Sequence, residues 1–181
     1  HRKFRKPLIM MTPKSLLRHK RCVSKLEEFG PGSSFHRVLW DDAELLKDQK
    51  IKLVADKEIK RVVLCTGKVY YDLYEERERR EISDIYLMRV EQLYPFPAKS
   101  LITELSRFPQ AEFVWCQEEP KNMGAWFFME PNIEWVLDHV GARYRRASYV
   151  GRPASAATAT GLLSKHNQEL NQFLSEALKI D

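Results

Sequence analysis

Apolar residues in this chain fall into short blocks whose spacing alternates between that of strands and that of helices. Residues 61–65 (RVVLC) form a continuous apolar block rich in β-branched side chains, which predicts a strand buried on both faces. Residues 85–90 and 112–116 predict two more strands. Residues 68–82 and 99–108 have apolar positions at helical spacing and predict a helix after each of the first two strands.

The N-terminal part gives a weaker pattern. Residues 7–11 (PLIMM) predict a short buried strand, and residues 37–40 predict another. Between them Thr12 is expected to cap a short helix, with Pro13 at its first position. The polar stretch 41–59 is expected to be a connection.

The C-terminal part adds three elements. Residues 124–139 predict a helix that breaks or kinks at Pro131, because proline lacks the backbone N–H that a helix interior needs. Residues 143–150 alternate in character, which is typical of an edge strand or of one with a solvated face. Residues 161–179 carry an apolar stripe and predict a closing amphipathic helix.

The order of these elements predicts the fold class. Strand, turn, helix and strand repeat over residues 61–116, which favours right-handed crossovers and a largely parallel sheet. We expect an α/β three-layer sandwich with a mostly parallel, mixed sheet of five to six strands and helices on both faces. Functional loops in such sheets follow the carboxyl ends of the strands, here residues 66–68, 117–126 and 151–161.

Charge is concentrated at one end of the chain. The 181 residues carry a net charge of +5, yet residues 1–25 contain nine basic side chains and no acidic one. A basic arm of this kind can bind a polyanion or serve as a linker. We expect one domain over residues 1–181, with residues 1–6 as a basic linker from a missing upstream domain. No nucleic-acid motif accompanies the arm, and no apolar run approaches the length of a membrane helix.

Candidate catalytic side chains do not assemble into a recognisable set. Cys65 and Cys116 lie in strand-like blocks and are expected to be buried thiols, and only Cys22 has basic neighbours that would favour a thiolate. Glu118 and Glu119 are adjacent on an extended segment, so their side chains should point in opposite directions. Gly67 is expected to serve a tight turn. The residues alone therefore predict no active site.

One loop has the composition of a contact or ligand loop. Arg152 precedes a run of small residues, 153–161, which permits close approach of another backbone or of a ligand. A guanidinium binds a carboxylate or phosphate through two parallel hydrogen bonds, so Arg152 suits an anion. The alternative is a surface arginine in a structural loop.

Five segments together resemble the C-terminal domain of the thiamine-dependent, decarboxylating component of 2-oxoglutarate dehydrogenase complexes. The resemblance spans nearly the whole chain, and QLYPFP and QEEPKNMGAW are its most specific parts. The segments are KPLIMMTPKSLLRH (6–19), CTGKVYYDL (65–73), RVEQLYPFP (89–97), WCQEEPKNMGAW (115–126) and YVGRPASAATATG (149–161).

The resemblance implies a function for the longer protein. Family members are homodimers that decarboxylate 2-oxoglutarate on thiamine diphosphate with magnesium and pass the succinyl group to a lipoyl-bearing succinyltransferase, in the bacterial cytoplasm or the mitochondrial matrix. The family's GDG motif for the diphosphate and magnesium is absent from these residues. We therefore expect the cofactor to be bound by domains outside this chain, and the chain alone to be inactive and to support dimerisation.

The resemblance also implies a regulatory ligand. Family members accept acyl-CoA or an adenine nucleotide on this domain, and the candidate phosphate contacts are Lys14, Ser15, Arg18 and Arg152. The first three lie at the start of a short expected helix, where free N–H groups attract anions. The competing interpretation is that Arg18 pairs with a carboxylate of another domain or subunit. A second function class, an independent polyanion- or nucleotide-binding module, would use the basic arm.

An interface is expected where large apolar side chains occur on a loop. Met123, Trp126, Phe127 and Phe128 are predicted to form an exposed cluster. Together with the small residues after Arg152, this cluster should lie on or near the homodimer contact.

Overall fold

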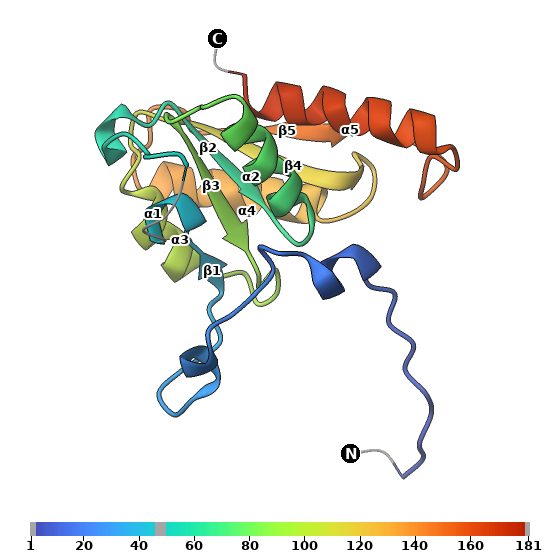
Figure 1. Cartoon of the computed structure of the whole chain (residues 1–181). Coiled ribbons are helices and arrows are strands. Elements are labelled where there is room, and N and C mark those ends of the chain that lie inside the picture. The colour runs from blue at the N-terminus through green and yellow to red at the C-terminus, as the bar shows by residue number, and fades with distance from the viewer. Residues whose placement is uncertain (1–2, 46–49, 180–181) are drawn as a thin grey trace. The chain divides into compact units, whose positions relative to one another are not determined.

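The computed structural model describes residues 3–45 and 50–179 and divides the chain into two units. The first unit ends at Ser34 and the second begins at Phe35, and each is described by itself (Figure 1). Residues 1–2 of the expected linker and 46–49 of the expected connection lie outside the described residues.

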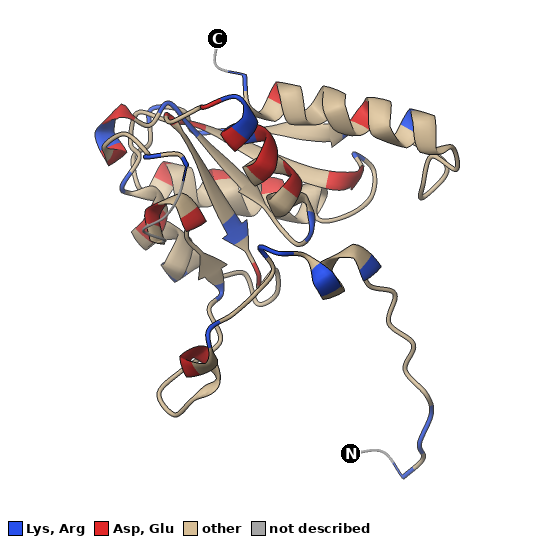
Figure 2. Cartoon of the chain, in the orientation of Figure 1, with Lys and Arg blue, Asp and Glu red and all other residues tan. Residues whose placement is uncertain are grey.

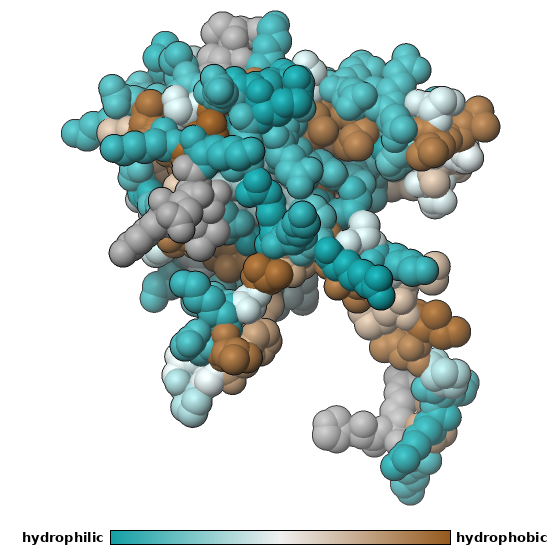
Figure 3. Space-filling model, in the orientation of Figure 1, coloured by the Kyte–Doolittle hydropathy of each residue, from teal (hydrophilic) through white to brown (hydrophobic). Residues whose placement is uncertain are grey.

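The first unit contains two short 3₁₀ helices, η1 (Lys14–Arg18) and η2 (Leu26–Phe29). The strand predicted at residues 7–11 is wrong, because the described residues of this unit include no strand. Leu8 to Met11 are instead between 74% and 94% exposed, and Figure 3 shows apolar side chains at the surface of this unit. A strand needs a neighbouring strand for its backbone, and this unit offers none.

The expected start of the first helix also needs correction. The cap of η1 is Pro13, which makes no side-chain capping bond, so Thr12 is not the cap. A 3₁₀ helix is wound more tightly than an α-helix. At the end of η1 the backbone N–H of His19 donates to the carbonyl of Leu16.

The second unit is built on a five-stranded mixed sheet with the order β1-β3-β2-β4-β5. Four strands are parallel, and the short β1 pairs antiparallel with β3. This confirms the predicted fold class and places the alternating strand, β5, at an edge. The strands are β1 (Val38–Leu39), β2 (Arg61–Cys65), β3 (Ile85–Val90), β4 (Glu112–Pro120) and β5 (Ala147–Arg152).

Helices cover both faces of this sheet (Figure 1). α3 (Ala98–Leu105) and α4 (Trp126–His139) pack on one face, and α2 (Val69–Arg79) and α5 (Leu163–Ala177) on the other. The short elements α1 (Asp42–Leu45) and η3 (Asp56–Glu58) lie in the connection between β1 and β2. No helix in the described ranges combines the length and apolarity that crossing a membrane requires.

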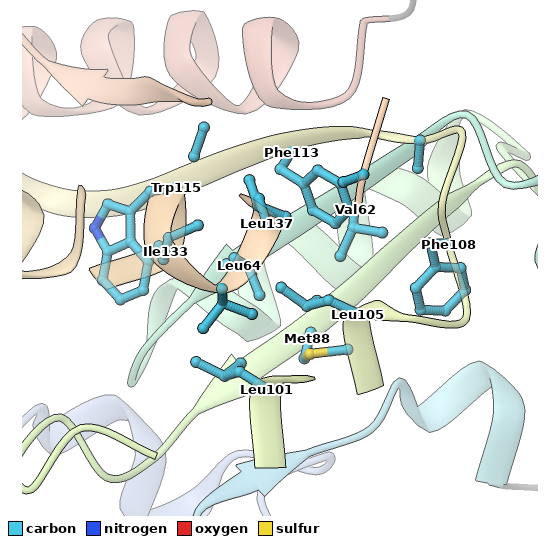
Figure 4. Close-up of a cluster of buried hydrophobic side chains, with 14 of the residues drawn as sticks. Val62, Leu64, Met88, Leu101, Leu105, Phe108, Phe113, Trp115, Ile133 and Leu137 are labelled. Carbon is cyan, nitrogen blue, oxygen red and sulfur yellow. The ribbon is translucent and has the colours of Figure 1, made fainter. Parts of the chain in front are cut away.

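The larger core lies between the sheet and α3 and α4. Alternate residues of the strands point into it, as the period of a strand requires, so Val62 and Leu64 meet Met88 and Trp115 there (Figure 4). Val63 and Cys65 alternate with them and are equally buried, on the side of α2 and α5. This two-sided burial explains why β2 shows no polar alternation.

α4 is continuous across Pro131, so of the two predicted outcomes, a break or a kink, the break is wrong. Pro131 is exposed, as is Phe127, whose carbonyl would have received the missing N–H. Water can therefore satisfy that carbonyl, which lowers the penalty for a proline inside a helix.

A buried ion pair joins distant parts of the second unit. Asp41 and Arg77 have fully buried side chains and form a two-armed pair, with Arg77 Nη2 donating to Asp41 Oδ1 at 2.7 Å. Asp41 also accepts the N–H of Leu87 at 2.7 Å, and Arg77 donates to the carbonyl of Ile85 at 3.0 Å. The pair thus fixes the segment after β1 to α2 and β3.

Candidate functional site

The three loops singled out from the sequence follow strands whose carboxyl ends lie at one edge of the sheet. β2, β4 and β5 are parallel and adjacent, with Cys65 opposite Cys116 and Cys116 opposite Val150. We call the ends of these strands, with residues 66–68, 117–126 and 151–161, the carboxyl edge. In open α/β sheets ligands bind at such edges, so this region is the candidate site.

Gln117 organises the loop that follows β4. Its side chain is buried, and its Oε1 accepts from the indole N–H of Trp115 at 2.9 Å and from the backbone N–H of Trp126 at 3.0 Å. Its Nε2 donates to the carbonyl of Met123 at 2.7 Å and approaches the carbonyls of Glu119 and Pro120 at 3.2 Å each. One amide therefore holds both ends of residues 117–126.

Two glycines make this arrangement sterically possible. A Cβ on Gly124, whose φ is +67°, would lie 2.8 Å from Nε2 of Gln117. A Cβ on Gly151 would lie 2.7 Å from the carbonyl oxygen of Gln117 and 2.5 Å from the hydroxyl of Tyr149. Any larger residue at either position would displace the side chains that order the loop.

The loop after β4 is bonded to the small-residue loop after β5. The side chain of Asn122 donates to the carbonyl of Ser155 and accepts its N–H, both at 2.9 Å. The N–H of Lys121 donates to the carbonyl of Arg152 at 3.0 Å, and the hydroxyl of Tyr149 donates to the same carbonyl at 2.7 Å. The two loops therefore form one ordered layer over the carboxyl edge.

Arg152 is a buried member of this layer. Its Nε donates to the carbonyl of Glu118 at 3.0 Å, and its Nη atoms contact the carboxylate of Glu169 and the Nδ1 of His166. Its guanidinium also lies 5.6 Å from the ring centre of Phe173. The anion that the sequence predicted for Arg152 is, in this structure, a carboxylate of α5.

A hollow of about 180 Å³ lies beside Arg152. Small residues of the loop after β5 line it, together with the polar groups of Ser155, Lys165 and Glu169. Both cations of its lining contact Glu169, Arg152 at 2.5 Å and Lys165 at 3.8 Å, so their charges are already partly neutralised.

Lys68 connects the remaining loop to the same edge. Its ammonium lies 2.5 Å from the carboxylate of Asp72 and 3.1 Å from that of Glu118. Burial opposes the charge of Lys68, but hydrogen bonds and attraction from the two carboxylates outweigh burial and raise its pKa. Glu118 is thus held in an ion pair while Glu119 is exposed, so the two adjacent acids do not act together.

The remaining sequence candidates belong to the first unit or to the buried strands of the second unit. Lys14, Ser15 and Arg18 are exposed residues of η1 in the first unit, so three of the four proposed phosphate contacts share one element and Arg152 does not. Cys65 and Cys116 are buried as expected, and burial raises the pKa of both thiols. Among residues 3–45 and 50–179 no group of three or more potential ligands could hold a metal ion.

The expected exposed cluster is only partly correct. Trp126 is 3% exposed and packs in the core at the start of α4, because Gln117 fixes its backbone N–H. Phe127 and Phe128 are exposed, at 63% and 40%. Sequence reasoning missed the roles of Gln117, Asn122 and Tyr149, although all three lie in the segments that carry the family resemblance.

Comparison with known proteins identifies related chains. Residues 23–178 match the family model described as 2-oxoglutarate dehydrogenase C-terminal. The "2-oxoglutarate dehydrogenase E1 component" of Brucella anthropi is 69% identical over 98% of this chain, and that of Brucella ovis is 68% identical over the same share. The chain spans 18% of the length of each of these relatives.

We predict that Gln117→Glu destabilises the second unit by on the order of 3 kcal/mol at pH 7, because a buried carboxylate would face carbonyl oxygens without a proton to donate. Burial raises the pKa of such a carboxyl above its unfolded value of about 4.3. The loss of unfolding free energy should therefore be small when the pH is below the unfolded pKa of about 4.3, and it should grow as the pH rises above that value. Urea unfolding followed by tryptophan fluorescence measures it.

The matched control is Gln92→Glu. The Nε2 of Gln92 donates to the carbonyl of Pro95 at 2.7 Å in an exposed position, so we expect a loss below about 1 kcal/mol with little pH dependence. Equal losses for the two variants would show that Gln117 does not hold the loop.

Proposed function

The chain belongs to the family of 2-oxoglutarate dehydrogenase C-terminal domains, and from that membership we propose that it is the supporting C-terminal domain of a longer 2-oxoglutarate dehydrogenase E1 component. The longer protein would oxidatively decarboxylate 2-oxoglutarate and pass the succinyl group to the lipoyl group of a succinyltransferase, a step of the tricarboxylic acid cycle. The observation that carries this proposal is 69% identity over 98% of the chain to an E1 component.

In this proposal the chemistry belongs to other parts of the longer protein. Thiamine diphosphate with magnesium would supply the carbanion chemistry of decarboxylation when bound. The described residues do not fit that group, because the carboxylates of Glu118 and Glu169 at the carboxyl edge are already paired with Lys68 and Arg152. We derive no catalytic step through this chain and assign it support of the fold and assembly, in the bacterial cytoplasm where such relatives would act.

Assembly is the role for which the second unit has a suitable surface. Phe127, Phe128 and Trp135 lie along α4 with exposed fractions of 63%, 40% and 55%, and the ring of the exposed Tyr94 lies 6.4 Å from that of Phe128. We call these four residues the aromatic patch. Exposed apolar patches on soluble proteins commonly mark interfaces, and we assign this one to the homodimer contact.

The small-residue loop would contribute to the same contact. It ends in Leu162 and Leu163, which are 68% and 74% exposed, and Figure 3 shows apolar side chains at the N-terminal end of α5. Small side chains permit close approach of a second backbone. Met123, which is half-buried, stays in the proposed contact, whereas Trp126 is removed from it.

A regulatory anion site in the first unit is the second part of the proposal. Lys14, Ser15 and Arg18 are exposed on one short helix, and Figure 2 shows basic residues there. A phosphate of an acyl-CoA or an adenine nucleotide suits such a group. Arg152 is not included, because its donors are already bonded within the second unit.

We expect a protein of the relatives' length that carries this chain to release CO₂ from 2-oxoglutarate when thiamine diphosphate and magnesium are supplied. The 181-residue chain alone should give no heat of binding with the same cofactors in calorimetry. Turnover of pyruvate in place of 2-oxoglutarate, or a micromolar cofactor site on the chain alone, would contradict the proposal.

The assembly proposal predicts that Phe127→Ser combined with Trp135→Ser weakens the dimer of the longer protein at least about tenfold, because truncating buried aromatic anchors costs more than about 1 kcal/mol. Sedimentation measures the dissociation constant. Tyr144→Ser is the control, since Tyr144 is also partly exposed, at 39%, but is not part of the patch. A dimer unchanged by the double variant would refute the assignment.

The anion proposal predicts that Arg18→Ala in the longer protein weakens activation by acyl-CoA or adenine nucleotide while basal turnover stays within a fewfold. The guanidinium would be lost from the phosphate contact but not from the chemistry. Arg5→Ala, which removes another exposed basic side chain of the first unit, should leave activation intact. An unchanged effector response of Arg18→Ala in an intact dimer would rule this site out.

A further inference from the structure

One arginine of the second unit, Arg89, has a more distant carboxylate partner than the other buried or half-buried arginines. Arg61, Arg107 and Arg152 each have a carboxylate oxygen within 2.5–2.9 Å, and Arg77 is paired with Asp41. Arg89 has none so close: its nearest carboxylate oxygen, on Asp42, lies 3.9 Å from Nη2. Yet the side chain of Arg89 is only 15% exposed.

The donors of Arg89 are incompletely used. Its Nη1 reaches the hydroxyl of Tyr71 at 3.4 Å, and its Nε is buried with no hydrogen-bond partner among the described residues. A guanidinium presents five N–H donors in one plane, and a buried donor without a partner is costly; among the described residues the Nε of Arg77 is in the same position. The ion pair of Arg89 with Asp42, at 3.9 Å, is therefore looser than the ion pairs of the comparable arginines, whose carboxylate oxygens lie within 2.9 Å.

Two tyrosines pack against the face of the Arg89 guanidinium and leave the N–H groups at its edge uncovered by their rings. Its central carbon lies 4.1 Å from the ring centre of Tyr70 and 5.7 Å from that of Tyr71, both in the first turn of α2. Stacking engages the face of a guanidinium and fixes its plane. An anion binds instead to the in-plane N–H groups, so the stacking orients Arg89 for a partner that approaches along the edge.

The position of Arg89 in the fold suits a contact with another part of a protein. Arg89 pairs in register with Cys65, the last residue of β2, and with Leu39 of β1. It therefore lies at the carboxyl ends of β2 and β3, next to the turn at Gly67. Segments that approach a parallel sheet from outside meet it at this end.

The surroundings indicate which kind of anion can bind. The charges of Asp42 and Glu91 both act on Arg89, so a small free anion would have to overcome their repulsion. A carboxylate that is tethered to a docked polypeptide arrives at a high effective concentration and overcomes such repulsion more easily. The observations therefore favour a tethered carboxylate over a dissolved phosphate.

We propose that Arg89 is one half of an interdomain ion pair, whose carboxylate comes from polypeptide outside these 181 residues. The relatives are more than five times as long as the segment they share with this chain, so such polypeptide is available. The proposal rests on the chain being part of a longer protein and not on the reaction proposed for that protein.

Arg107 provides a matched control. It is also a half-buried arginine over aromatic rings, at 5.3 Å from Tyr86 and 5.0 Å from Phe108, but its carboxylates, Glu44 and Asp56, lie within the chain. Replacing Arg107 by methionine should therefore have the same effect whether or not other domains are present.

The test is amide hydrogen exchange of β3 in Arg89→Met and Arg107→Met variants, each made in the 181-residue chain and in a protein of the relatives' length. We expect Arg89→Met to speed exchange less than about twofold in the chain alone and at least about tenfold in the longer protein. Arg107→Met should speed it in both. Arg89→Lys, which keeps the charge but not the planar fork, should recover part of the protection in the longer protein.

Three results would overturn the proposal. If Arg89→Met speeds exchange equally in both proteins, Tyr70 and Tyr71 are the complete partners of Arg89 and no external carboxylate exists. If inorganic phosphate slows exchange in the wild-type chain alone but not in its Arg89→Met variant, the site binds a free anion instead. If Arg89→Met leaves the exchange of β3 unchanged in the longer protein, Arg89 binds neither a tethered carboxylate nor a free anion.

Discussion

The buried pair of Asp41 and Arg77 is the interaction on which the placement of the second unit's elements depends. Both charges are fully desolvated, and the pair is tolerable only because Ala43 and Leu87 donate N–H groups to the carboxylate and Ile85 accepts from the guanidinium. Loss of either partner would leave an isolated charge in the interior, which typically costs about 3–5 kcal/mol. Because Arg77 is in the last turn of α2, the pair also fixes the direction in which α2 leaves the turn at Gly67, and with it the position of Tyr70 beside Arg89.

The carboxyl edge follows the same physical rule but with neutral groups at its centre. Gln117 satisfies two N–H donors and reaches three carbonyl oxygens with a single amide, so the loop after β4 needs no charge to be ordered. The charged groups around it, Lys68 with Glu118 and Arg152 with Glu169, pair with one another. A catalytic acid or base must be free to exchange a proton with a substrate, whereas these groups hold loops in place. The paired charges at the carboxyl edge therefore serve to hold the loops in place and not to exchange protons with a substrate.

Local pattern was sufficient to predict most of the second unit. The continuous apolar block of β2 indicated burial on both faces, and the alternation of β5 indicated an edge strand. Both features can be read from residues that are neighbours in the chain. Side-chain partners far apart in the chain were not predictable in this way: 36 positions separate Asp41 from Arg77. The same limit explains two errors. Trp126 looked like an exposed loop residue because its partner Gln117 could not be identified, and residues 7–11 have the composition of a strand but no strand beside them in their unit.

Three features of the described residues depart from what a self-contained domain shows. Leu8 to Met11 are largely exposed although they are apolar, the aromatic patch along α4 is partly exposed, and the half-buried Arg89 has its nearest carboxylate oxygen, on Asp42, at 3.9 Å. The three features differ in kind: an exposed apolar segment, an uncovered apolar face and a loosely paired charge. Under the assembly and ion-pair proposals above, all three have the same explanation, namely contacts with other parts of a longer protein. Two of these features belong to the second unit, whose hydrophobic core, sheet and loop after β4 are nevertheless held by contacts within the unit. This is the arrangement that we expect of a domain that folds around its own core and, as proposed above, works within a larger assembly.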